Sequence, residues 1–159
     1  MSRTRRWLAF TELPEFNVAV FALLLNYPWE FSQVPLFAGM ADAPHWDAIR
    51  ICAIATLGDI VIMLIAYWLV AVIARSRFWF AAPTAAQLMM FVAVRRSDHR
   101  THRASCAARM VVQQLGLLAA LMPVIPGIGV GLSPLAQWVV LPLLTAWFVR
   151  RQWRLTRIL

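Results

Sequence analysis

Six side chains that could do chemistry fall at helical spacing inside two long apolar stretches of the chain. They form two triplets with the same spacing: Asn26, Glu30 and Gln33 in the first stretch, and Cys52, Thr56 and Asp59 in the second. Positions i, i+4 and i+7 share one face of an α-helix. Each stretch is therefore predicted to carry a polar stripe that contains one carboxylate.

The two carboxylates are expected to lie at similar depth. Glu30 comes 13 positions before Ala43, the centre of the intervening loop, and Asp59 comes 16 positions after it. Antiparallel neighbouring helices would thus bring the two stripes face to face. Such a pair could relay a proton, act as acid and base on a lipid-soluble substrate or bind a cation. In the alternative interpretation, the stripes only hydrogen-bond the helices together.

Other polar residues give weaker signals. Arg50, near the start of the second stretch, could be a third partner for Asp59, although snorkelling of its head group to the interface explains it as well. His45 could bind a metal with Asp42 or Asp47, but a single histidine in a loop is usually only solvated. We predict no metal site and no cofactor.

The elements that must position these side chains are membrane helices. The chain has 159 residues, 62% of them hydrophobic, and a mean hydropathy of +0.68, which is too apolar for an ordinary soluble domain. At about 20 residues per crossing, this length allows about four membrane elements. We therefore expect an all-α, polytopic membrane helical bundle that forms one integral membrane domain over residues 1–159.

The positive charge is interpreted as a membrane signal. The net charge is +8, and the fifteen cationic residues are all arginines, nearly all of them between or beyond apolar runs. This pattern follows the positive-inside rule and favours anionic lipid headgroups as partners of the Arg clusters, together with the lipid bilayer itself. No nucleic-acid partner is expected. Arginine without lysine is typical of a GC-rich bacterial genome, so we expect a bacterial inner membrane.

Apolar runs and breakers predict the order of the elements. We expect spans at about 13–37, 49–74, 78–94 and 132–149, a basic loop at 95–109 and a Pro/Gly break at 123–134. Both termini are predicted to be cytoplasmic. Trp46 and Trp79, which flank the second span, are expected at the membrane interfaces, and Cys52 is expected to be a small core residue.

The threading of the third span stays open. Either 78–94 crosses and the basic loop lies on the periplasmic side, or 78–94 re-enters and 110–149 forms a helical hairpin. A third interpretation is that residues 95–109 reflect a frame disturbance in GC-rich coding DNA.

The chain resembles small uncharacterised bacterial multi-pass inner-membrane proteins. The resemblance rests on "NYPWEFSQVPLF", "HWDAIRICAIATLGDIVIMLIAYWLVA" and "MPVIPGIGVGLSPLAQWVVLPLLTAWFVRRQ". It implies an inner-membrane location and marks four residues as motif members: Trp29, Glu30, Gly58 and Asp59. It implies no known function.

The expected function is that of a small non-catalytic membrane protein. We expect an accessory subunit of other membrane proteins or a lipophilic-ligand binder, built around a Glu30/Asp59 polar core. One alternative is a membrane-embedded enzyme that uses Glu30 and Asp59 as acid and base on an isoprenoid or lipid. The other is a proton-coupled carrier.

Overall fold

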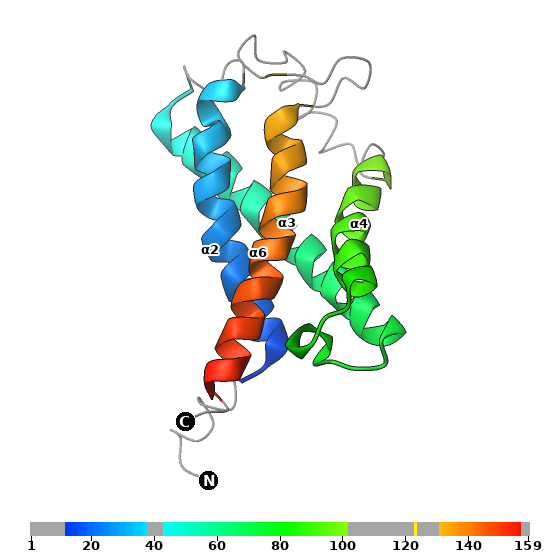
Figure 1. The fold of residues 1–159 in the computed structure, drawn as a ribbon. Coiled ribbons are helices and arrows are strands. Elements are labelled where there is room, and N and C mark those ends of the chain that lie inside the picture. Colours follow the sequence, from blue (N-terminus) through cyan, green and yellow to red (C-terminus); the bar gives the residue numbers. More distant parts are fainter. Residues whose placement is uncertain (1–11, 38–42, 102–122, 124–130, 157–159) are drawn as a thin grey trace.

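A computed structural model describes residues 12–37, 43–101, 123 and 131–156 of the chain. Its elements within these ranges are helices: α2 (Pro14–Gln33), η1 (Val34–Leu36), α3 (His45–Ile73), η2 (Trp79–Ala81), α4 (Ala85–Thr101) and α6 (Leu132–Thr156). α2 contacts α3 and α6, and α4 contacts α3 and α6. In Figure 1, α2 and α6 run in opposite directions, α3 crosses behind them, and α4 runs along the other side of the bundle.

Two of these helices are long and apolar enough to cross a membrane. α3 has 29 residues and a mean hydropathy of 2.3 in its most apolar window, and α6 has 25 residues and a mean hydropathy of 1.6. α2 is shorter, with 20 residues, and the polar triplet and Glu15 lower its hydropathy. The all-helical architecture expected from the sequence is confirmed for the described residues.

The third helix begins later than the apolar run that predicted it. Residues 78–84 form a turn that includes η2, and α4 continues to Thr101, into the segment expected to be a basic loop. The start is fixed by a capping box: the Thr84 amide donates to Gln87 Oε1 at 2.9 Å, and the Gln87 amide donates to Thr84 Oγ1 at 3.3 Å. This reciprocal pair satisfies two amides at a helix N-terminus.

The last helix, α6, begins at Leu132, as the sequence predicted. It ends at Thr156, seven residues beyond the predicted end of the span at residue 149. The Leu132 amide donates to the carbonyl of Pro123 at 2.8 Å, which ties the start of α6 to the first residue of the predicted Pro/Gly break. Residues 124–130 of that break, and residues 102–109 of the predicted basic loop, lie outside the described residues.

A Schellman motif ends α3. The Ser76 amide donates to the Ala71 carbonyl at 3.0 Å and the Arg75 amide to the Val72 carbonyl at 3.1 Å. This motif needs a left-handed residue between helix and loop, a position usually held by glycine. Here it is Arg75, with φ of 50°.

Aromatic side chains fill the core where α3 ends. Tyr67 of α3 lies with its ring centroid 6.1 Å from that of Trp79, which in turn meets Phe91 of α4 at 5.5 Å. The Phe78 ring lies beside that of Trp153 of α6, with 4.5 Å between the centroids and 30° between the ring planes. Trp79 is only 4% exposed, because its ring packs between Tyr67 and Phe91. Its location at the depth of a membrane interface stays a prediction.

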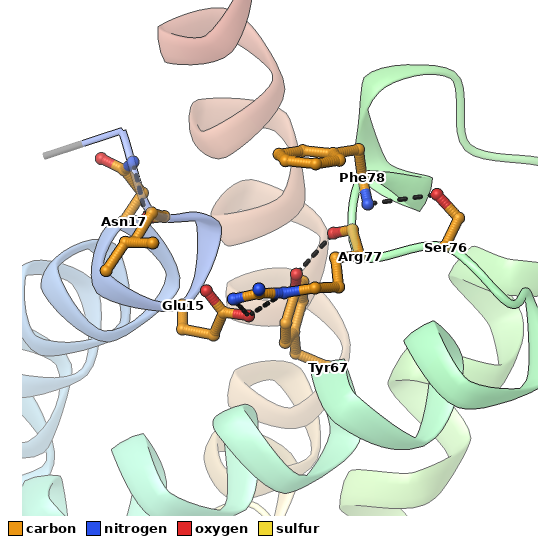
Figure 2. A network of polar contacts seen from close by, with 7 residues as sticks. Glu15, Asn17, Tyr67, Ser76, Arg77 and Phe78 are labelled. Carbon is orange, nitrogen blue, oxygen red and sulfur yellow. Dashed lines mark hydrogen bonds and ion pairs between the residues drawn. The ribbon is translucent and has the colours of Figure 1, made fainter. Parts of the chain in front are cut away.

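A polar clasp closes the same end of the bundle (Figure 2). The Tyr67 hydroxyl donates to the carbonyl of Arg77, and the Arg77 guanidinium donates to Glu15 Oε1 at 2.8 and 3.1 Å. The hydrogen bond to Glu15 raises the pKa of the Arg77 guanidinium above its usual value. The start of α2 is thereby attached to the loop after α3.

Candidate functional site

The centre of the candidate site is the side-chain amide of Gln137 in α6. Its Nε2 donates to Glu30 Oε1 at 2.7 Å, to Asp59 Oδ2 at 2.9 Å and to Asn26 Oδ1 at 3.3 Å. Glu30 and Asn26 belong to α2 and Asp59 to α3. One amide group therefore joins three helices.

The oxygen of the same Gln137 amide also has a hydrogen-bond partner. Gln33 Nε2 donates to Gln137 Oε1 at 3.1 Å. Asn26 is held in turn by its own helix, since its Nδ2 donates to the Ala22 carbonyl at 2.7 Å. We call Asn26, Glu30, Gln33, Asp59 and Gln137 the Gln137 cluster.

The amides of the cluster are more deeply buried than its carboxylates. Asn26, Gln33 and Gln137 are 0%, 2% and 4% exposed, whereas Glu30 and Asp59 are partly exposed. Buried amides need hydrogen-bond partners, and the cluster supplies them from within. The carboxylates at its edge keep some access from outside the bundle.

The local sequence explains how α2 presents three members of the cluster. Asn26, Glu30 and Gln33 follow the i, i+4, i+7 spacing on a helix that begins with Pro14 in its first turn. Pro28 lies inside this helix and is exposed. Because proline has no amide hydrogen, the helix loses one backbone bond near the cluster.

The second predicted triplet only partly joins the cluster. Asp59 is a member, while Cys52 and Thr56 are buried on the same helix face, 3% and 1% exposed. Glu30 lies close enough to Cys52 to act on its thiol electrostatically. Thr56 Oγ1 is buried and has no hydrogen-bond partner among the described residues. The expectation that Cys52 is a core residue is confirmed.

The structure brings Glu30 and Asp59 to one nitrogen atom. Their bonded oxygens cannot be farther apart than the sum of the 2.7 and 2.9 Å bonds. This juxtaposition agrees with the depth comparison made from the sequence. The role of the pair stays a prediction.

Sequence reasoning missed Gln137, the residue that organises the site. A signal was present, because Gln137 is an amide inside the apolar run predicted as the last span. Polar residues within such runs usually face the bundle and mark interhelical contacts. A search for paired carboxylates does not find Gln137, because its side chain is an amide.

The weaker candidates do not join the site. Arg50 is exposed, and so are His45 and Asp47. Asp42 lies outside the described residues. Within the described part of the chain, no three His, Cys, Asp or Glu side chains form a group that could hold a metal ion.

Comparison with protein-family models, with curated proteins and with solved structures gave no match to this chain. The Gln137 cluster and the surfaces of the four helices are therefore the features from which a function can be inferred.

Proposed function

We propose that the protein is a small, non-catalytic, multi-pass protein of a bacterial inner membrane, with the Gln137 cluster as its intramembrane polar core. The observation that carries this proposal is the hydrogen bonding of Gln137 to both carboxylates. The side chains that an acid/base enzyme would direct at a substrate are here bonded to the protein's own amide. That arrangement is the polar association expected between membrane helices.

The outer surface of α3 supports the membrane location. Large apolar side chains recur on it at spacings of three and four residues, and each is more than 40% exposed: Ile54, Leu57, Val61, Ile65, Trp68 and Val72. A soluble monomer rarely exposes so long an apolar stripe. We propose that this stripe contacts lipid or another membrane subunit, which fits an accessory role.

Arginines and tryptophans support the orientation. The Arg77 guanidinium lies over Trp68 and that of Arg151 over Trp147, each 5.4 Å from a ring centroid. Each pair lies in the C-terminal part of its helix or just after it, and Figure 1 shows that α3 and α6 finish at the end of the bundle where α2 begins. We propose that this end is cytoplasmic, with the arginines near anionic headgroups.

The course of α4 supports one of the two threadings. It starts beside the end of α3, packs along α3 and α6, and finishes toward the opposite end of the bundle (Figure 1). At 1.5 Å per residue, its 17 residues span about 26 Å, close to the hydrocarbon thickness of a bilayer. We propose that α4 crosses the membrane, which places Arg100 on the periplasmic side.

The test of a non-catalytic role is complementation of a gene deletion by Glu30→Gln and Asp59→Asn. Each variant keeps an oxygen that can accept from Gln137 but cannot act as a general acid or base. Full complementation by both variants, at normal protein levels, supports the proposal. Loss of function in a folded variant would favour the alternative of acid/base or proton chemistry.

A further inference from the structure

An exposed stripe along α6 changes from apolar to aromatic to basic toward the end of the helix. Its members follow one another at spacings of three and four residues, so they share one helix face: Val140, Leu144, Trp147, Arg151 and Arg154. All five are exposed, and the exposed fractions of the first three are 40%, 37% and 49%. The elements that pack on α6 in the described part of the chain therefore leave this face uncovered.

The order of polarity along the stripe is that of a phospholipid. Apolar side chains suit acyl chains, a tryptophan suits the membrane interface, and arginines suit anionic headgroups. From Val140 to Arg154 the helix rises by about 21 Å, at 1.5 Å per residue. One leaflet with its headgroups is about 20–22 Å thick. The stripe thus matches a single lipid in length as well as in polarity.

The arginines of the stripe have no acidic partner among the described residues. At this end of the bundle, Glu15 forms an ion pair, but with Arg77 of the clasp (Figure 2). Glu12, the other described carboxylate near the start of α2, forms no ion pair with a described arginine. The positive charges of Arg151 and Arg154 are therefore available to an anion from outside the chain.

Arg150 adds a third guanidinium beside the stripe. It precedes Arg151 in the chain and lies one turn before Arg154. The residue is only partly exposed, and its Nε is buried without a hydrogen-bond partner in the part of the chain that the structure describes. A buried charged donor without a partner costs free energy. An oxyanion on the outer nitrogens of the same group would offset this cost, because the positive charge is delocalised over the guanidinium.

The helix dipole accounts for only part of this charge. Cations are favoured in the last turn of a helix, and Arg154 lies there in α6. Arg150 and Arg151 come before that turn. The Arg151 guanidinium lies over the Trp147 ring, 5.4 Å from its centroid, so a positive charge is held beside an exposed tryptophan. That combination is suited to the headgroup level of a membrane.

We propose that this face of α6 binds one anionic phospholipid, whose phosphate accepts hydrogen bonds from Arg150, Arg151 and Arg154. The acyl chains lie along the apolar part of the stripe, and Trp147 contacts the lipid between these two regions. Arginine suits the site because its planar fork can donate two parallel hydrogen bonds to a phosphate. The inference rests on the proposed function, since it requires this end of the bundle to lie at a lipid surface, and it assigns one lipid to one helix face.

The experiment is native mass spectrometry of the purified full-length protein in detergent, titrated with dioleoylphosphatidylglycerol. Wild type should bind one molecule of this lipid about tenfold or more tightly than dioleoylphosphatidylcholine, which has the same chains but no net charge. Inorganic phosphate at millimolar concentration should not displace the lipid, because burial of the acyl chains contributes to binding. Equal affinity for the two lipids, or displacement by inorganic phosphate, would overturn the proposal.

Arg150→Gln tests the phosphate contact, and Arg75→Gln is its matched control. Each variant removes one positive charge at the same end of the bundle, but Arg75 follows α3 and lies off the stripe. Arg150→Gln should weaken binding of phosphatidylglycerol about tenfold, because a charge-assisted hydrogen bond is lost. Arg75→Gln should change it by less than about twofold. An equal loss in both variants would indicate diffuse attraction and would overturn the site.

A second variant guards against an Arg150→Gln protein that does not fold. Arg151 is exposed, so Arg151→Gln should keep the circular dichroism of wild type and weaken lipid binding by a similar factor. Unchanged lipid binding in this folded variant would also overturn the proposal.

Carbonate extraction of membranes reports the membrane location independently of lipid binding. Protein that remains in the membrane but does not prefer phosphatidylglycerol contradicts the lipid site alone. Protein released by carbonate contradicts the proposed function and, with it, the lipid site.

Discussion

At the residue scale, four hydrogen bonds meet at Gln137 and connect α6 to α2 and α3. Gln137→Leu has nearly the same volume but neither donates nor accepts. It should lower the free energy of unfolding by about 3 kcal/mol, because buried polar and charged groups lose a partner without regaining water. Thermal unfolding in mild detergent, followed by circular dichroism, measures the change.

The control for this substitution lies on the same helix. Gln152→Leu makes the same chemical change near the end of α6, away from the cluster, and should alter the unfolding temperature little. If both leucine variants unfold at the same temperature as wild type, the cluster does not hold the helices together.

Tyr67 allows a second prediction at this scale. Tyr67→Phe removes the hydrogen bond to the Arg77 carbonyl but keeps the buried ring. It should cost about 1 kcal/mol of unfolding free energy, and added salt should not change this loss.

Arg77→Ala removes an ion pair whose arginine is 53% exposed. Its effect should stay below about 1 kcal/mol and shrink at high salt. A salt-dependent loss in Tyr67→Phe would contradict this division of roles.

The sequence was a good guide to which residues of the first two helices meet, and a poor guide to what joins them. The spacing of Glu30 and Asp59, counted from the loop, was sufficient to place them at one level, because antiparallel helices constrain depth strongly. Gln137 follows them by more than 75 residues, and most of the preceding segment, residues 102–130, lies outside the described residues. No local pattern fixes the rotation of α6 against α2 and α3, so its contact with the pair could not be derived.

At the element scale, the ends of helices depend on short-range chemistry that hydropathy overlooks. The T-x-x-Q pattern of Thr84 and Gln87 is a sequence-level signature of a helix start. It lies inside the apolar run that set the predicted span at 78–94, and the apolar run alone placed the start too early. The end of α3 was harder to place, because the left-handed position carries Arg75 where a glycine would be expected.

Arg75 therefore gives an element-scale prediction. Arg75→Gly should stabilise the protein by about 1 kcal/mol, since glycine adopts positive φ without the steric cost that an L side chain meets there. Arg75→Ala removes the same charge but keeps the Cβ atom, so it should give no such gain. The comparison uses thermal unfolding in detergent at fixed salt. A gain of equal size in both variants would assign the effect to charge and not to the backbone.

At the scale of the whole molecule, the bundle has two chemically different ends. The end where α3 and α6 finish holds the clasp and the arginine–tryptophan pairs, whereas His45 and Asp47 lie exposed at the start of α3. The mean hydropathy of α3 and α6 and the apolar stripe of α3 suit a bilayer between these ends. α4 matters most for the threading, since its last turns carry basic residues away from the clasp.

Single cysteines in intact cells test this arrangement against the hairpin threading. In a background with Cys52→Ala and Cys106→Ser, a membrane-impermeant maleimide should label Asp47→Cys and Arg100→Cys but not Arg75→Cys. The reason is that α4 crosses the bundle and carries position 100 to the same side as position 47. Permeabilised cells, in which all three should react, control for reactivity. Labelling of the cysteine at position 47 without labelling of the cysteine at position 100 would instead indicate that the basic segment is cytoplasmic, and it would favour re-entry of residues 78–94.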